Sequence, residues 1–500
     1  MISSRTFRMI LIGFSIIFLS LSLVIFLMDQ QDFKNRSSTY PEGTTVNNVP
    51  LGGLDHDQAA ERLNLVFSQP LEMRYGDARM QFSPSELGFT PDIEATLQDI
   101  DTNNKGKQYW AYLWGNDPQV AVKGTLKTNM DEEKLEAFFS STILPRYDQP
   151  ATAPYPVIYT THFEPGQPGT QLDQQAAVSL VKNSLTSASD RIVDLPIIQA
   201  PPLPLDVQNL QIFLEQTVLL EEFDDLIEVY VQDLSGDMDL HLALMDNQPV
   251  LPDVAYSAAS TIKIPIMLSV LKRSQEPTSQ AIQDLLERMI ALSENPPADT
   301  LMSSYIDPTR GPLIVTEDLQ MLGYQNTFLA GYFGMGSPLL KVYETPANTR
   351  TDIYLDPDVY NQTVPSEIGD LLAQIYQCAY PKTGTSKISE IFRSEVSQTE
   401  CQTILDLLGK NKIGVLMEAG LPPQASAAHK HGWTPELDGL LHSISDAGIV
   451  STSGGDYVLV MFMHTSDQLV FDEGNWLFAK LSQTIYNAFN INDQTYWWIE

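Results

Sequence analysis

The hydrophobic pattern divides the chain into regions of different character. Residues 9–28 form an uninterrupted apolar run without a charge. From residue 41 to 200, short strand-like alternations are mixed with helix-spaced apolar positions. A Pro-rich stretch at 200–205 then separates this part from the remainder. We therefore predict a membrane anchor at 1–30, small α+β modules at 41–102 and 103–200, and a large domain at 205–500.

The apolar run is long enough to cross a bilayer as one helix. Arg5 and Arg8 precede it and Asp29 and Asp32 follow it, so the positive-inside rule places the N-terminus in the cytoplasm. A cleaved signal peptide is the alternative, but the run is longer than a usual signal core and no small-x-small site follows. We expect a single-pass protein of the cell membrane with the chain after residue 30 outside.

The pattern of the last region predicts an α+β domain. A helix at 207–220 precedes strands at 226–234 and 240–245, and helical patterns dominate from 260 to about 375. Three strands follow at 425–433, 441–451 and 457–465, and a helix at 475–489 closes the sequence. Strands at both ends and helices between them predict an antiparallel sheet flanked by a helical subdomain.

Charge and cysteine content limit the function. The chain has 63 acidic and 29 basic residues and a formal charge of −34. Such a protein repels phosphate, which excludes a nucleic-acid partner. Cys378 and Cys401 permit one disulfide in an exported protein, while two buried free thiols remain the alternative.

A Ser-x-x-Lys motif points to nucleophilic catalysis, but it occurs three times, at Ser179, Ser260 and Ser269. A serine needs a base to accept its proton, and a lysine serves only if its pKa is lowered. Ser260 follows the small residues YSAA and begins the apolar helix STIKIPIMLSVL, which places Lys263 on the same face and favours its burial. We therefore choose Ser260 with Lys263.

Two further motifs suit the same chemistry. Ser293-Glu294-Asn295 follows a helical run, and its Ser could relay a proton to a leaving nitrogen. Lys430-His431-Gly432 lies on the strand at 425–433, where a glycine allows close approach of a substrate. Lys382-Thr383-Gly384 is a closer match to the usual Lys-Thr-Gly spelling, but it lies in a Pro/Gly/Ser loop, so we choose residues 430–432.

These motifs, in this order on helix, loop and strand, resemble the class A β-lactamases and penicillin-binding proteins across residues 205–500. The resemblance implies a cell-surface serine hydrolase of bacterial type that β-lactams or peptidoglycan stem-peptide amides acylate at Ser260. It implies proton transfer by Lys263 and Ser293, and an oxyanion hole from the backbone N–H groups of Ser260 and Trp433. The implied substrate-binding residues are Asn295, Lys430, His431, Gly432 and Trp433.

The chain departs from that pattern at three points. The interval from Ser260 to Ser293 is short for a class A enzyme, which indicates a trimmed helical subdomain. His431 replaces the usual small hydroxyl residue by an imidazole. Glu344 and Asn348 have the i, i+4 spacing of the deacylating loop, but the sequence around them is stretched. With Glu344 as base the acyl-enzyme would be hydrolysed. Without it the acyl group would persist, as in a transpeptidase or carboxypeptidase.

The modules at 41–200 resemble peptidoglycan-binding-like repeats through the phrases EGTTVNNVPLGGLDHDQA and FEPGQPGTQLDQQAA. Whether they bind cell-wall glycan or act as a spacer remains open. A catalytically silent wall-binding protein is the competing function, although such a protein would have little reason to keep Ser260, Lys263 and Lys430.

We expect no cofactor and no metal. His429, His431 and His442 lack the spacing of zinc ligands, and no phosphate-binding glycine loop is present.

Overall fold

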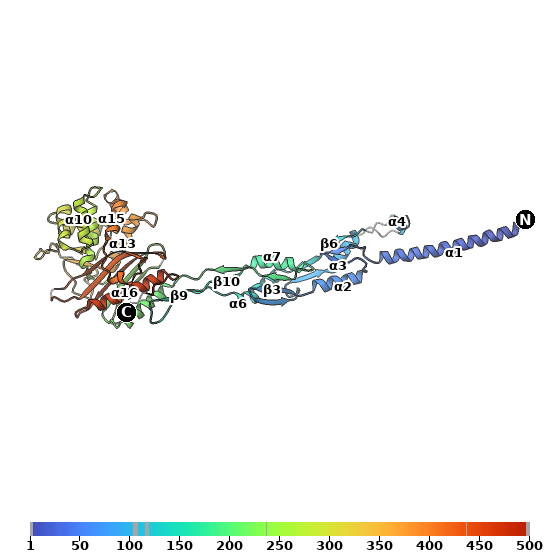
Figure 1. Cartoon of the computed structure of the whole chain (residues 1–500), viewed down its shortest axis with the longest axis horizontal. Coiled ribbons are helices and arrows are strands. Elements are labelled where there is room, and N and C mark those ends of the chain that lie inside the picture. The colour runs from blue at the N-terminus through green and yellow to red at the C-terminus, as the bar shows by residue number, and fades with distance from the viewer. Residues whose placement is uncertain (1–3, 104–108, 116–119, 237, 437, 497–500) are drawn as a thin grey trace. The chain divides into compact units, whose positions relative to one another are not determined.

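The computed structural model describes residues 4–103, 109–115, 120–236, 238–436 and 438–496. Two compact units are formed, one by Met1–Thr152 with Pro168–Pro202, the other by Ala153–Gln167 with Leu203–Glu500. We call them the N-terminal and C-terminal units (Figure 1).

The N-terminal unit begins with the long helix α1 (Ser4–Ser37). Its part Phe7–Ser37 has a mean hydropathy of 2.8 over its most apolar window, none of which is buried. The helix is long and apolar enough to cross a membrane, a property that a membrane anchor and a signal sequence share.

The rest of the N-terminal unit is small α+β structure around one hydrophobic core. Helices α2 and α7 each start at an aspartate whose side chain accepts a backbone N–H, because such caps satisfy groups that the first turn leaves free. The helices are α2 (His56–Phe67), α3 (Ile93–Asn103), α4 (Tyr109–Leu113), α5 (Glu132–Phe138), the π-helical turn η1 (Phe139–Ile143), α6 (Leu144–Tyr147) and α7 (Gln174–Leu185). The strands are β1 (Thr45–Val46), β2 (Val49–Pro50), β3 (Leu71–Tyr75), β4 (Ala78–Phe82), β5 (Phe89–Asp92), β6 (Lys123–Gly124), β7 (Lys127–Met130), β10 (Gly169–Leu172), β11 (Ile192–Asp194) and β12 (Ile197–Ala200).

The boundaries of the two compact units differ from those of the modules expected at 41–102 and 103–200. Strand β11 pairs in parallel with β3, and β7 pairs with β5, so strands from both ranges share sheets. Residues 153–167 leave this unit altogether: β8 (Tyr155–Pro156) and β9 (Phe163–Glu164) belong to the C-terminal unit. The local hydrophobic pattern could not reveal these boundaries, because each strand pairs with a partner far away in sequence.

A six-stranded antiparallel sheet organises the C-terminal unit, in the order β15-β14-β13-β21-β20-β19. Strand β13 pairs with β21 along its full length, from Leu226↔His464 to Asp233↔Tyr457, which joins the two ends of the domain in the middle of the sheet. The α+β fold and the antiparallel sheet are thus confirmed. The strands are β13 (Leu226–Asp233), β14 (Leu240–Met245), β15 (Gln248–Pro249), β19 (Ser426–Trp433), β20 (Ser443–Thr452) and β21 (Gly455–His464).

Each face of the sheet packs on its own core. Helices α8 (Val207–Leu220) and α16 (Phe471–Phe489) share one core with Val229 and Met461. The other face, with Val460, packs on the helical subdomain. Figure 1 shows α10, α13 and α15 gathered on that side. The subdomain contains α9 (Lys263–Leu271), α10 (Gln280–Ile290), α11 (Asn295–Leu301), α12 (Gly311–Met321), α13 (Pro365–Ala379), α14 (Lys387–Ile391), α15 (Gln398–Leu408), and the short turns η2 (Ala259–Ile262), η3 (Met302–Ile306) and η4 (Arg393–Glu395). The turn η5 (Leu416–Gly420) instead belongs to the core that α8 and α16 share.

Two features fix this subdomain. A disulfide joins Cys378 at the end of α13 to Cys401 in α15. A second, small sheet in the order β16-β18-β17 interrupts the region where the sequence indicates helices alone. It consists of β16 (Tyr256–Ser257), β17 (Phe328–Leu329) and β18 (Asn361–Thr363), strands too short to give a period-two signal. Its consequence is to hold the segment that leads to Ser260 against the residues after position 360.

Candidate active site

Ser260 lies in the 3-10 turn η2, just before the buried helix α9. Ala259 has a φ of 46°, a conformation that is uncommon for a residue with a side chain. The next three residues tighten into a single turn, and the helix proper starts only at Lys263. The sequence places the helix start at Ser260 itself. Ser260 and Lys263 nevertheless share one face, because i and i+3 are neighbours in either type of helix.

The ammonium group of Lys263 contacts Ser260 directly. Its Nζ donates to Ser260 Oγ at 3.0 Å, to the Ser293 carbonyl at 2.7 Å and to Asn295 Oδ1 at 2.7 Å. Burial lowers the pKa of Lys263 to about 8, although Asp299 opposes the shift. About one tenth of a lysine with that pKa is neutral at pH 7. Lys263 therefore contacts Ser260 with a pKa suited to accepting a proton.

The Ser293-Glu294-Asn295 segment completes the polar cluster around Ser260. Ser293 Oγ donates to Ser260 Oγ at 3.1 Å and lies 3.5 Å from Lys263 Nζ. Ser293 has a φ of 56°, and the chain then enters α11 with Asn295 as its first residue. The Glu294 side chain forms an ion pair with Arg288. The structure thus brings together Ser260, Lys263, Ser293 and Asn295 from three separate elements.

Strand β19 carries the Lys430-His431-Gly432 motif at the edge of the main sheet. A side chain on Gly432 would start 3.2 Å from the backbone N of Ser260 and 3.1 Å from the Ala258 carbonyl. The absence of a side chain is therefore what lets this strand lie against the Ser260 turn.

Lys430 is fully buried, and its Nζ donates to the His431 carbonyl at 3.0 Å. Burial, reinforced by the nearby charge of Lys263, lowers the pKa of Lys430 to about 7. An incoming carboxylate would oppose that shift and keep the lysine charged.

His431 replaces a hydroxyl residue by a flat, neutral ring. Burial, with the charge of Lys430 adding to it, lowers the pKa of His431 to about 2. Its ring stacks on Trp433 with 4.3 Å between centroids, and its Nδ1 lies 3.1 Å from Asn411 Nδ2. Asn411 and Asp446 hold strand β19 through their contacts with His429. Asn411 Nδ2 donates to the His429 carbonyl, and Asp446 Oδ1 lies 2.8 Å from His429 Nδ1.

Asp299 also lies beside Lys263, although no motif in the sequence points to it. Its two oxygens accept the backbone N–H groups of Phe333 and Gly334, each at 2.8 Å. Burial raises the pKa of Asp299, while these N–H groups and Lys263 oppose the shift. The Phe333 ring lies 5.4 Å from Lys263 Nζ. Asp299 thereby holds an aromatic side chain over the lysine.

Glu344 is not joined to this cluster. Its side chain is exposed and forms no hydrogen bond or ion pair within the described residues. Asn348, its predicted companion, instead bonds to the Thr345 N–H at 2.8 Å and to Gln362 Oε1 at 2.9 Å. Asn348 therefore shapes its own loop.

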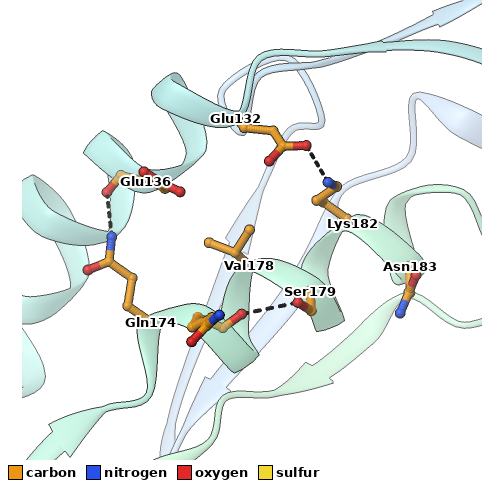
Figure 2. A pocket seen from close by; sticks show the side chains of 8 residues that line it. Glu132, Glu136, Gln174, Val178, Ser179, Lys182 and Asn183 are labelled. Atoms are coloured by element: carbon orange, nitrogen blue, oxygen red, sulfur yellow. Dashed lines mark hydrogen bonds and ion pairs between the residues drawn. The ribbon is translucent and has the colours of Figure 1, made fainter.

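The other two Ser-x-x-Lys matches form no serine–lysine pair. Ser179 Oγ donates to the Gln175 carbonyl, and Lys182 pairs with Glu132 (Figure 2). Both residues line an open hollow on the N-terminal unit. Ser269 is buried in α9, while Lys272 pairs with Asp318. Lys382-Thr383-Gly384 lies in an exposed turn after α13, as its loop composition indicates.

Comparison with known families adds to this picture. Residues 275–489 match the sequence model of a family described as the beta-lactamase enzyme family. This part of the chain is thus similar to the beta-lactamase enzyme family. The matched range includes Ser293, Asn295 and Lys430 but begins after Ser260 and Lys263. No protein with curated annotation matches the chain.

Several solved structures are similar to part of this chain. PBP-A is 22% identical, with a TM-score of 0.40, over 58% of this chain and 99% of that one. A class A beta-lactamase from Bacteroides cellulosilyticus DSM 14838 is 16% identical, with a TM-score of 0.40, over 57% and 99% of the two chains. The extended-spectrum beta-lactamase TLA-1 is 15% identical, with a TM-score of 0.40, over 56% and 98%.

Proposed function

We propose that the C-terminal unit is a serine acyltransferase or hydrolase whose Ser260 is acylated by β-lactams or by related peptidoglycan amides. The contact of Lys263 Nζ with Ser260 Oγ at 3.0 Å, by a lysine whose pKa is lowered to about 8, carries this proposal. A nucleophile, an adjacent base and a second hydroxyl are the components that acyl transfer requires.

In the proposed acylation step, one proton moves from Ser260 to Lys263 and one proton reaches the leaving nitrogen. Neutral Lys263 takes the proton of Ser260 Oγ as this oxygen bonds to the carbonyl carbon of the substrate. The carbon–nitrogen bond breaks, and the leaving nitrogen receives a proton through Ser293 Oγ, which is 3.1 Å from Ser260 Oγ. Ser293 in turn is replenished from Lys263, 3.5 Å away. The backbone N–H groups of Ser260 and Trp433 are the proposed donors to the developing oxyanion.

Substrate binding is assigned to β19 and Asn295. Lys430 supplies the positive charge for a substrate carboxylate, and Gly432 lets the edge strand lie close to the Ser260 turn. The His431–Trp433 stack offers a flat apolar wall where the family pattern has a hydroxyl. Asn295 Oδ1 holds Lys263, and its amide N–H group is suited to a substrate carbonyl.

Glu344 is not placed to release the acyl group from Ser260. Its exposed side chain, without a recorded contact to Ser260 or Lys263, favours a long-lived acyl-enzyme. This supports a penicillin-binding transpeptidase or carboxypeptidase over rapid antibiotic hydrolysis.

The N-terminal unit fits a cell-surface protein. We infer that α1 anchors the chain in the cell membrane with the bulk of it extracytoplasmic, where a disulfide such as Cys378–Cys401 persists. The modules between α1 and residue 200 then act as a spacer or as a peptidoglycan-binding element.

A fluorescent penicillin tests the proposed function. The full chain in detergent is expected to acquire one covalent label, and digestion followed by mass spectrometry should locate the penicilloyl mass on the peptide that contains Ser260. A label elsewhere, or no label at millimolar penicillin, would refute acylation at Ser260.

Glu344→Gln tests the release step separately. We expect the lifetime of the labelled protein to be unchanged, since the Glu344 side chain is exposed and forms no recorded bond with the cluster. The measurement is the loss of fluorescence after a chase with unlabelled penicillin, beside Glu317→Gln as a control on an exposed helical carboxylate. A lifetime at least about 100-fold longer in Glu344→Gln alone would instead make Glu344 the deacylating base.

A further inference from the structure

A short aromatic segment of the N-terminal unit lies against the long helix α1. Residues 109–114 read YWAYLW, and the first five of them form α4. The Tyr109 ring packs edge-on against Phe26 and Phe33, with 5.8 and 5.3 Å between ring centroids. The Tyr112 ring also contacts Phe33, at 5.5 Å between centroids. The two tyrosines, three residues apart on one side of α4, therefore attach it to α1.

This contact lies at the level where the apolar part of α1 ends. The apolar run 9–28, at about 1.5 Å per residue, matches the thickness of a hydrocarbon core of about 30 Å. Along the helix axis, Phe26 lies about 3 Å before the end of that run and Phe33 about 8 Å beyond it. The headgroup layer on each side of the core is about 5 to 8 Å deep. Tyr109, which contacts both phenylalanines, therefore lies at the border between hydrocarbon and headgroups when α1 spans a bilayer.

The tryptophans of the same segment face solvent instead. The side chains of Trp110 and Trp114 are 69% and 84% exposed, and their i, i+4 spacing puts them on one face. The Trp114 N–H donates to the Trp110 carbonyl, which continues the turn of α4 by one residue. Of the four tryptophans in the described part of the chain, these two alone are exposed. Two large aromatic side chains that share an exposed face are typical of an interaction surface.

A lipid surface is the partner that fits this pair of tryptophans. Tryptophan is enriched where a bilayer meets water, because its ring is apolar while its indole N–H can still bond to water or to headgroups. The chain as a whole has a formal charge of −34, which disfavours attraction to an anionic surface. The contact is therefore apolar in character, and a zwitterionic lipid is sufficient for it.

We propose that Trp110 and Trp114 insert into the headgroup layer of the bilayer that α1 spans, as a second membrane contact of the N-terminal unit. This inference rests on the proposed anchoring of the chain by α1. The segment α4 has too little apolar area to bind a membrane alone, but α1 holds it at the surface, which makes its insertion an intramolecular step. The second contact fixes how the unit is rotated about the axis of α1, since a single spanning helix leaves that rotation free.

Site-specific fluorescence tests this contact in the full chain. Both native cysteines form the disulfide, so Trp110→Cys and Trp114→Cys each offer a single reactive thiol for an environment-sensitive dye. The labelled proteins are reconstituted into phosphatidylcholine vesicles, with and without a lipid that carries a nitroxide near its headgroup. We expect the dye at either position to shift its emission to the blue and to lose most of its fluorescence to the nitroxide lipid. Both positions are exposed, so the substitutions leave the core of the unit intact.

Two further single-thiol variants are the controls. Ile198→Cys places the dye on an exposed apolar residue of β12 in the same unit, where it should keep its fluorescence. Leu19→Cys places it in the middle of the apolar run, where a nitroxide deep in the acyl chains should quench it. Quenching at Leu19 with none at either tryptophan position, or equal quenching at these positions and at Ile198, would overturn the second contact and leave the anchor in place. An unquenched dye at Leu19 would refute anchoring by α1, and the second contact with it.

Discussion

Replacing Ser260 with alanine is expected to abolish covalent penicillin labelling while the protein stays folded. Ser260 Oγ is the atom on which Lys263 Nζ and Ser293 Oγ converge, at 3.0 and 3.1 Å. No other acceptor of the acyl group replaces it, so the loss should exceed about 1,000-fold, the order that removal of an essential catalytic residue causes. Gel fluorescence after a timed reaction measures the labelling, and thermal unfolding checks the fold.

Ser269→Ala is the matched control for this substitution. Ser269 belongs to the same helix and to a Ser-x-x-Lys match, but its buried hydroxyl has no hydrogen-bond partner within the described residues. Its removal should leave labelling unchanged. Undiminished labelling of Ser260→Ala, or equal losses in both variants, would contradict the assignment of the nucleophile.

Lys263→Met is expected to lower the acylation rate by about 10² to 10⁴, the range that general acid–base catalysis contributes. Methionine keeps the length and apolar stem of the side chain but cannot accept a proton. In the wild-type protein only neutral Lys263 is active, and its pKa is lowered to about 8. The acylation rate at saturating penicillin should therefore fall about tenfold per pH unit below pH 8 and level off above it.

The inflection in this pH profile distinguishes a catalytic role of Lys263 from a packing role. Lys263→Met should react slowly with no inflection near pH 8, whereas a lysine that only fills space would leave the inflection in place. Lys182→Met removes the lysine of another Ser-x-x-Lys match, which pairs with Glu132 in the N-terminal unit, and should match the wild-type rate at each pH. An inflection that persists in Lys263→Met would assign it to another group.

The C-terminal fold could be predicted because its sheet consists of long, patterned strands. Strands β20 and β21 have ten residues each, and helix α8 spans the expected residues 207–220. Short elements escaped prediction for the same reason. The small sheet of β16, β17 and β18 contains strands of two or three residues, whose pairing joins segments far apart in sequence, such as Tyr256 with Thr363 and Phe328 with Gln362.

The residues of the candidate site also divide into those that local motifs predict and those that they do not. Ser260, Lys263 and Ser293 belong to local motifs, and their proximity followed from helix geometry and from a resemblance. Asp299 and Asn411 act through backbone groups of distant segments, at Phe333 and His429, and a hydrogen bond to a backbone group leaves no motif in the sequence. For Glu344 the prediction rests on its i, i+4 spacing to Asn348 alone, and in the structure that asparagine donates to the Tyr343 carbonyl within its own loop. The catalytic role of each residue stays a prediction.

Residues 153–167 belong to the C-terminal unit, although the residues on both sides of them in the sequence belong to the N-terminal unit. This arrangement decides where the chain can be cut. The Phe163 ring packs on Phe213 with 5.1 Å between centroids, and the Thr161 hydroxyl bonds to Gln483 in the last helix. A truncated protein that begins at the Pro-rich stretch would lose both contacts and uncover an aromatic surface on α8. A proteolytic or recombinant fragment that retains the whole C-terminal unit must therefore start at or before residue 153. Such a fragment also contains residues 168–202, which belong to the N-terminal unit.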